Sequence, residues 1–182
     1  MATYCDYCNS HPEDTFNRTY HDTQYGFPLK DDNLLFERLI LEINQAGLSW
    51  ITILKKADHF HNAYNGFDID KVAKYSEKDV ARLLADAGII RNRLKVNAAV
   101  VNAQRIKEIQ KEHGSFKAWL DANRQLSKEE WVKLFKRTFV FTGGEIVNEF
   151  LMSTGYLPGA HDESCPIYKK VASLRPAWTR AR

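Results

Sequence analysis

The chain has little of several features that mark particular protein classes. It has only three cysteines in 182 residues, too few for a disulfide framework, and nine glycines and five prolines, too few for a low-complexity chain. No apolar run approaches the roughly 18 residues that a membrane span needs. The first ten residues, MATYCDYCNS, contain no apolar stretch typical of a signal peptide. These absences favour a soluble, cytoplasmic, globular protein with no membrane partner.

The charge of the chain is nearly balanced. Lysine and arginine number 26 against 23 aspartates and glutamates, a net charge of +3. The basic residues nevertheless gather in two segments, Arg91–Lys111 and Pro166–Arg182, and the second contains no acidic residue. Such clusters suit a phosphate backbone, but short basic runs are as often simply solvated. Charge alone leaves both interpretations open.

The pattern of caps and apolar spacing predicts helices throughout. Asp31 to Asn33 can cap a helix ending at Gly47, and Ser49 a second one. Capping-box patterns at Ser76 and Ser127 predict two more helices, and others are expected up to Glu112, from Ser115, and from Gly144 to Gly155. No strand alternation persists. We expect one all-α domain over residues 1–182, with irregular ends at 1–30 and 155–168 and a basic tail at 169–182.

The cysteines have a spacing typical of a metal site. Cys5 and Cys8 form a C-x2-C pair, and His161 and Cys165 form an H-x3-C pair. Zinc is commonly bound by two such short-spaced pairs. Spacing alone favours Cys5, Cys8, His161 and Cys165, with the further histidines His11 and His21 in reserve. A site closed by four protein ligands is structural, and it would join the two ends of the chain.

Residue types that can take part in catalysis or ligand binding are concentrated in the segment Leu41–Trp50. Glu42 stands between Leu41 and Ile43, so its carboxylate lies either on a polar helix side or in the interior for a purpose. Trp50 is either a core residue, as most tryptophans are, or part of a site. No Ser/His/Asp order, glycine-rich phosphate loop or paired-carboxylate pattern stands out.

A helix–turn–helix unit is expected over residues 83–101. Its turn, Gly88-Ile89-Ile90, is followed directly by Arg91, Arg93 and Lys95. A tight turn of this kind can direct backbone N–H groups at a phosphate. The alternative is a plain helical hairpin with a solvated basic flank.

Three segments carry a resemblance to a known family. The runs LEINQAGLSWITILKK, DAGIIRNRLKVNA and YHDTQYGFP, together with Cys5 and the late H-x3-C pair, resemble the bacterial 3-methyladenine DNA glycosylase I family over roughly Tyr4 to Cys165. The resemblance implies an all-α helix-hairpin-helix DNA glycosylase fold with its hairpin at 83–101. It also implies DNA-backbone contacts at Gly88, Arg91, Arg93 and Lys95.

The resemblance further implies the site residues. It assigns one structural Zn²⁺ per chain to Cys5, His21, His161 and Cys165, replacing Cys8 of the spacing-based set. Glu42 and Tyr20 take the catalytic roles, Glu42 hydrogen-bonding the base and Tyr20 lining its pocket. The substrate-binding positions are Trp50, which stacks on the base, and Phe16, Asn44 and Tyr7.

The implied activity is monofunctional base excision. Alkylated double-stranded DNA is the expected partner of a monomeric enzyme, which flips the damaged base into a pocket. It then hydrolyses the N-glycosidic bond, leaving an abasic site and 3-methyladenine as product, with no lyase step. N3 methylation makes the purine cationic, so an aromatic face and a carboxylate favour it over normal adenine.

The chain also departs from the family pattern. Tyr7 stands where tryptophan is usual, Asn44 where glutamine is usual, and Asn17 where a pocket tyrosine is expected, with Phe16 beside it as a replacement. Glu145 places a carboxylate in an expected pocket wall or DNA-facing turn, and Asn148 replaces an aromatic residue. The alternatives are therefore a glycosylase with shifted lesion specificity and a zinc-stabilised module that binds damaged DNA without cutting. A zinc hydrolase is disfavoured, because a closed ligand set leaves no open position.

Overall fold

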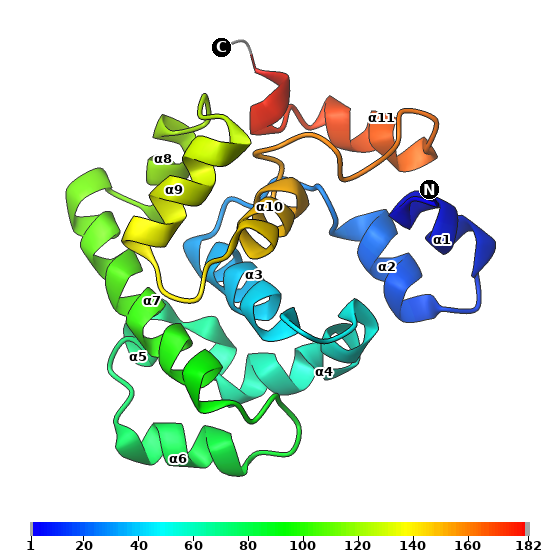
Figure 1. Ribbon diagram of the computed structural model, residues 1–182. Helices are drawn as coiled ribbons and strands as arrows, with labels where there is room; N and C mark the ends of the chain where they lie inside the picture. Colours follow the sequence, from blue (N-terminus) through cyan, green and yellow to red (C-terminus); the bar gives the residue numbers. More distant parts are fainter. Residues whose placement is uncertain (1, 181–182) are drawn as a thin grey trace.

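The computed structural model describes residues 2–180, which contain helices and no β-strand. This confirms the all-α class predicted from the sequence. Figure 1 shows the arrangement of the helices, which in chain order are α1 (Tyr4–Ser10), α2 (Thr15–Thr23), α3 (Asp32–Gln45), α4 (Trp50–Ala63), η1 (Asn65–Phe67), α5 (Ile69–Val72), α6 (Glu77–Ala85), α7 (Arg93–His113), α8 (Phe116–Ala122), α9 (Lys128–Thr138), α10 (Gly144–Ser153), α11 (Pro166–Ser173) and η2 (Ala177–Thr179).

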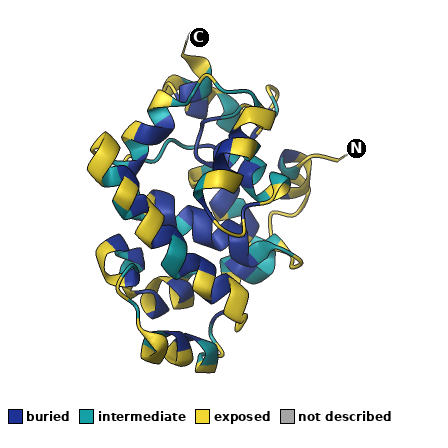
Figure 2. Ribbon diagram, turned by 60° about the vertical axis from the view of Figure 1, so that its left-hand side comes forward, coloured by how far each residue is buried: buried dark blue, intermediate teal, exposed yellow. Residues whose placement is uncertain are grey.

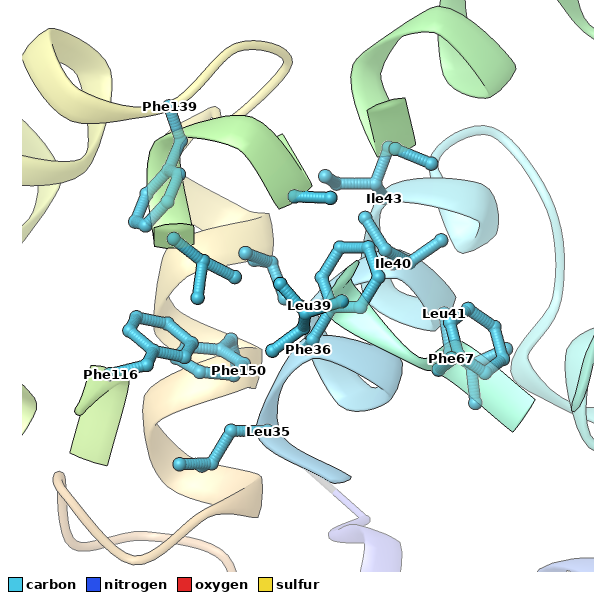
Figure 3. Close-up of a cluster of buried hydrophobic side chains, with 14 of the residues drawn as sticks. Leu35, Phe36, Leu39, Ile40, Leu41, Ile43, Phe67, Phe116, Phe139 and Phe150 are labelled. Carbon is cyan, nitrogen blue, oxygen red and sulfur yellow. The ribbon is translucent and has the colours of Figure 1, made fainter. Parts of the chain in front are cut away.

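Helix α3 forms the centre of the core. It packs against α4, α7, α8 and α10, so apolar side chains cover most of its circumference. Those of Leu35, Phe36, Leu39, Ile40 and Ile43 are fully buried. Figure 3 shows them meeting phenylalanines of α8 and α10, and Figure 2 shows buried residues gathered at the middle of the molecule. Three polar residues of α3, namely Arg38, Glu42 and Asn44, are therefore buried inside the protein.

The ends of the central helices follow the predicted signals. The Asp31 carboxylate accepts the Leu34 N–H at 3.0 Å and caps α3. Gly47 lies just past the end of α3 with φ +80°, a conformation that favours glycine. At the start of α9, Ser127 and Glu130 form the predicted capping box, each side chain accepting the other residue's N–H. Of these features, Gly47 fixes where the α3–α4 turn begins.

The prediction of irregular ends was wrong for the first end, which is largely helical, but correct for residues 155–165, which contain no helix. Residues 1–30 contain α1 and α2, and α11 begins at Pro166. The box formed by Thr3 and Asp6 caps α1, and Asp14 caps α2. Isolated helices of seven to nine residues are marginal in water, so tertiary contacts must stabilise these. In Figure 1 the blue helices α1 and α2 lie near the orange segment before α11.

One further feature concerns membranes. Within residues 2–180 no helix combines the length and the apolar character needed to cross a bilayer.

Candidate functional site

A cavity of about 200 Å³ lies where α1 and α2 meet α3, α4 and α10. Two buried or partly buried carboxylates, one amide and four aromatic rings line it, namely Glu42, Glu149, Gln45, Tyr4, Tyr20, Tyr25 and Trp50. The cavity has room for one purine-sized ring system. Its walls come from five parts of the chain, so only the folded protein assembles it.

Glu42 is the most deeply buried acid of the cavity, with 3 % of its surface exposed. Burial raises the pKa of Glu42 to about 8; the nearby Glu149 acts in the same direction and the Arg38 guanidinium opposes it. At pH 7 the carboxyl group is therefore largely protonated in the protein alone. A cationic ligand beside Glu42 would favour its ionised form, so this position can distinguish a positively charged ring from a neutral one.

The aromatic wall is continuous across three elements. The rings of Tyr20 and Trp50 lie 5.1 Å apart between centroids, and those of Tyr20 and Tyr25 lie 5.6 Å apart. The Arg38 guanidinium lies over the Tyr20 ring, 5.1 Å from its centroid. The buried indole N–H of Trp50 has no hydrogen-bond partner among the described protein atoms. An aromatic face with an unsatisfied donor is suited to a flat, polar ligand.

The structure brings together only part of the predicted base site. Glu42, Tyr20 and Trp50 line the same cavity, whereas Tyr7, Phe16 and Asn44 do not. The side chain of Tyr7 is exposed and donates a hydrogen bond to Asp14, and Phe16 is 48 % exposed. The Asn44 amide points back along α3 and donates to the Ile40 carbonyl oxygen at 2.8 Å. Tyr7 and Asn44 therefore lie outside this cavity, while Phe16 borders a larger cavity that Tyr20 and Trp50 also line, and base contact by these three residues stays a prediction.

Three cavity residues were not predicted from the sequence, namely Tyr4, Tyr25 and Glu149, whereas Gln45 belongs to the predicted segment Leu41–Trp50. Tyr4 adjoins the predicted ligand Cys5, and its ring packs edge-on against His21 and Tyr25. It supplies the α1 aromatic ring that the prediction assigned to Tyr7. Glu149 gives no sequence signal, because only the packing of α10 against α3 turns it toward Glu42.

The departures expected at α10 lie outside this cavity. Glu145 is exposed and lines an outer groove, together with the α3–α4 turn. The Asn148 amide contacts the Met152 sulfur at 3.8 Å. Of the two predicted positions of Glu145, the wall of this cavity is therefore wrong, and an exposed turn that could face DNA stays a prediction. The additional carboxylate in the cavity is that of Glu149, four residues later.

Beside the cavity, four potential metal ligands converge: Cys5, His21, His161 and Cys165. All four are buried, and their ligand atoms lie within 4.8 Å of one another. The sulfur–nitrogen distances are 3.2 and 3.6 Å from Cys5 and 3.7 and 4.0 Å from Cys165. Ordinary zinc–sulfur and zinc–nitrogen bonds in a tetrahedron place such atoms about 3.6 Å apart. The donor set therefore fits a tetrahedral ion.

The second nitrogen of each clustered histidine has its own partner. His21 Nδ1 lies 2.7 Å from an Asp22 carboxylate oxygen, and His161 Nε2 lies 2.7 Å from the Tyr25 carbonyl oxygen. Such outer contacts orient metal-binding imidazoles. Burial also lowers the pKa of His161, which favours the neutral ring that a metal requires. This arrangement can hold an ion with both histidines correctly oriented.

The cluster does not include Cys8, although this thiol is fully buried. Its Sγ faces the Asn17 carbonyl oxygen at 3.7 Å, so the spacing-based set was wrong at this position.

Close packing around the cluster restricts Gly26, which has φ +80°. A Cβ there would lie 2.8 Å from the Ala160 side chain and 3.4 Å from the His161 ring. The loop after α2 can approach the cluster only with glycine at this position.

The turn between α6 and α7 presents two of the four residues predicted to contact DNA. Arg91 and Arg93 are exposed, and Arg93 makes only a 3.7 Å ion pair with Glu77. The Gly88 N–H is taken by the Asp86 carboxylate at 2.7 Å. A Cβ at Gly88 would lie 3.0 Å from the His59 ring, so close packing also restricts this residue.

Lys95 corrects the prediction of a phosphate contact, because its side chain is buried. Its ammonium group donates to the carbonyl oxygens of Asn44 at 2.8 Å and Ala46 at 2.7 Å. These carbonyls belong to the C-terminal end of α3, where cations are favourable. Lys95 thus ties the start of α7 to the turn between Glu42 and Trp50.

The remaining basic clusters are partly neutralised. Arg105 pairs with Glu108, and Lys107 pairs with Asp70. In the predicted basic tail, Lys170 lies over the Phe27 ring at 5.4 Å, while Arg182 lies outside the described residues. The hairpin arginines Arg91 and Arg93 are therefore the strongest candidates for phosphate contact.

Comparison with known proteins gives one consistent result. The family described as methyladenine glycosylase matches residues 9–168. The chain is 34 % identical to DNA-3-methyladenine glycosylase 1 of Escherichia coli, over 88 % of this chain and 96 % of that one. It is also 34 % identical to the DNA-3-methyladenine glycosylase of Haemophilus influenzae, over 91 % of this chain and 98 % of the relative.

Solved structures agree with the sequence relatives. A structure described as the basis of 3-methyladenine recognition by 3-methyladenine DNA glycosylase I of Staphylococcus aureus aligns with a TM-score of 0.81 and 31 % identity, covering 91 % of this chain and 97 % of that one. A variant of such an enzyme in complex with 3-methyladenine aligns with a TM-score of 0.80 over 88 % of this chain and 96 % of that one.

Proposed function

Because this chain belongs to the methyladenine glycosylase family, we propose that it excises 3-methyladenine from alkylated double-stranded DNA. It acts as a hydrolase on the N-glycosidic bond and leaves an abasic site. One observation carries the proposal: a single buried cavity contains Glu42, Tyr20 and Trp50 together. A protein that only contacts the DNA backbone needs none of these three side chains.

The cavity residues account for recognition of the damaged base. Extracting a base from a duplex costs a few kcal/mol, and stacking on Trp50 recovers about 1–3 kcal/mol. Methylation at N3 gives the nucleotide base a positive charge, which favours the aromatic faces of Trp50 and Tyr20. Glu42 provides the complementary carboxylate and accepts a hydrogen bond from the exocyclic amine. Unmodified adenine gains only the stacking contribution.

The hydrolysis step requires little acid catalysis. The cationic base leaves as a neutral molecule when the bond between N9 and C1′ breaks, so it needs no proton from the protein. What remains is to stabilise the positively charged sugar and to admit a water molecule. None of the lysines in residues 2–180 lines the cavity. A Schiff-base lyase step therefore has no nucleophile there, which supports monofunctional excision.

We assign a structural Zn²⁺, one per chain, to Cys5, His21, His161 and Cys165. The two thiolates and two imidazoles are the donor types that zinc prefers, at separations suited to a tetrahedron. When bound, the ion supplies cross-linking of the two ends rather than chemistry, because all four positions are taken. It would also fix Tyr4 and Tyr20, the immediate neighbours of Cys5 and His21, in the cavity wall.

The docking surface for DNA lies at the α6–α7 hairpin. We assign phosphate contacts to Arg91 and Arg93, with the Gly88 turn as the point of close approach. The protein acts as a monomer in the cytoplasm. The assigned DNA contacts rest on the exposed charges of the hairpin. They also rest on the hydrogen bonds from Lys95 to the α3–α4 turn, which link the hairpin to the cavity.

Base release from methylated DNA tests the function. The wild-type protein is expected to liberate free 3-methyladenine, separated by chromatography, and a Glu42→Gln variant to liberate far less. Quantifying 3-methyladenine and 3-methylguanine in the same reaction measures the lesion range. Absence of any released base, with binding to alkylated or abasic duplex retained, would instead favour a module that binds damage without cutting.

A further inference from the structure

Glu149 provides the cavity with a second carboxylate. It lies on α10, and its Oε2 accepts a hydrogen bond from the Tyr25 hydroxyl at 3.1 Å. Glu149 is only partly exposed, and the loss of solvent around its carboxylate raises its pKa. Recognition of the base by Glu42 and Trp50 leaves Glu149 without an assigned task.

The position of Glu149 differs from that of Glu42 in depth. Glu42 lines only the inner cavity, whereas Glu149 and Gln45 line both that cavity and the outer groove. The outer groove runs between the α3–α4 turn and the first turn of α10. Glu149 therefore stands at the mouth on the groove side, whereas Tyr20 and Trp50 border a second cavity of about 780 Å³ that α2, α3 and α4 line.

This order places the two acids beside different parts of a flipped nucleotide. A base that reaches Glu42 and Trp50 occupies the inner cavity, and its sugar follows behind it at the mouth. The sugar carries the positive charge that develops when the glycosidic bond breaks. A carboxylate at the mouth is then closer to C1′ than to the far edge of the base.

We propose that Glu149 is a catalytic carboxylate that stabilises the charged sugar and takes a proton from the attacking water. The inference rests on the proposed excision of 3-methyladenine. The bond between N9 and C1′ breaks, and its electron pair leaves with the base, which becomes neutral. The water oxygen forms the new bond to C1′, and Glu149 receives the proton that this water loses.

The charged neighbours of Glu149 suit this task. Burial and Glu145 on the same helix raise its pKa, while the Tyr25 hydroxyl and Lys128 of α9 oppose the rise. Glu42, from α3, interacts with Glu149, but when the cationic base is bound the Glu42 carboxylate is engaged with that base. Glu149 is then the acid that serves as proton acceptor. A general base is most effective when its pKa lies near the working pH.

The test compares Glu149→Gln with the wild-type protein on methylated DNA, with enzyme in excess so that a single turnover is followed. Glu129→Gln is the matched control, because it removes one exposed carboxylate from α9 outside the cavity. Loss of a general base is expected to slow release of 3-methyladenine by roughly 100-fold. Binding of free 3-methyladenine, followed by tryptophan fluorescence, should remain as in the control, and the Tm should not fall below that of the control.

A pH profile separates a chemical role from a structural one. Release by the wild-type protein should decline on the acid side as Glu149 is protonated, and this decline should be absent in Glu149→Gln. Tyr25→Phe removes the hydrogen bond that favours the charged carboxylate. It should therefore move the acid-side decline to higher pH without unfolding the protein.

Three results would overturn the inference. Equal rates for Glu149→Gln and wild type would show that the carboxylate is not needed, while leaving the excision activity intact. A parallel loss of base binding or Tm in Glu149→Gln would make Glu149 a structural residue. An unchanged pH profile in both variants would also exclude proton transfer to Glu149. Failure of the wild-type protein to release any base would instead refute the proposed function itself.

Discussion

Two buried polar clusters lie next to each other in this protein, and they differ in how well their polar groups are satisfied. In the cluster of Cys5, His21, His161 and Cys165, both histidine rings have partners for their outer nitrogens, and the inner atoms face one another. In the neighbouring cavity the Trp50 N–H has no partner among the described atoms, and Glu42 has its pKa raised to about 8.

The difference indicates which cluster serves structure and which serves a ligand. A buried donor left without a partner costs about 1–3 kcal/mol, and Trp50 differs from other residues with an unpartnered buried donor, such as Trp131, because it lines a cavity. The four-residue cluster is suited to an ion, whereas the cavity is suited to a flat molecule with a positive charge. The two are linked, since the Tyr4 ring packs against His21 and also lines the cavity.

The largest expected effect comes from breaking the metal cluster. Cys165→Ser should lose the ion and lower the Tm by roughly 10 °C or more, because zinc binding of this type is coupled to folding. Cys8→Ser is the matched control, an equally buried thiol outside the cluster, and it should keep one zinc per chain. Metal analysis and thermal melting measure both. A Cys165→Ser protein with full zinc content and an unchanged Tm would contradict the assignment.

The next largest effect is expected for Glu42→Gln. If the cavity serves a ligand rather than the fold, this change should lower activity without lowering stability. Removing the carboxylate should lower base release by roughly 100-fold, since electrostatic groups at the reacting ligand contribute on this scale. The same change should stabilise the protein, because it removes the cost of ionising a buried acid. Release assays and thermal melting on the same preparations test both parts.

The pH dependence of that stabilisation has a defined sign. The pKa of Glu42 is about 8 in the folded protein against an ordinary 4.5. The wild type therefore loses stability as pH rises above 4.5, and the loss is complete above about pH 8. The Tm advantage of Glu42→Gln should grow between pH 5.5 and pH 8. A Tm difference of the same size at pH 5.5 and pH 8 would show that burial does not raise the pKa of Glu42.

The smallest effects concern the hairpin, where exposed and buried cations can be compared. Arg91→Ala and Arg93→Ala should each weaken DNA binding several-fold and lower the slope of log K against log salt by about one. Lys95→Met should leave that slope unchanged and lower the Tm, because the Asn44 and Ala46 carbonyl oxygens lose their donor. A lower slope for Lys95→Met would show that this lysine reaches a phosphate.

The sequence predicted the central helices well because their signals are local. The Asp31 cap, the capping box at Ser127 and the left-handed Gly47 each act within a few residues, and each was found where expected. The short helices at the ends also have local caps, at Thr3 and Asp14, but helices of seven to nine residues are marginal on their own. They depend on tertiary contacts around the cluster of Cys5, His21, His161 and Cys165. Spacing alone placed Cys8 in this cluster instead of His21.

By itself the sequence determined the all-α class, the order of the central helices and, through resemblance, the three residues Glu42, Tyr20 and Trp50 that share the cavity. Only the tertiary structure decided which other residues join them. It left Tyr7, Phe16 and Asn44 outside this cavity, buried Lys95, and brought Tyr4 and Glu149 in. The physical reason is that a helix cap depends on a few neighbouring residues, whereas a cavity wall depends on how separate helices pack.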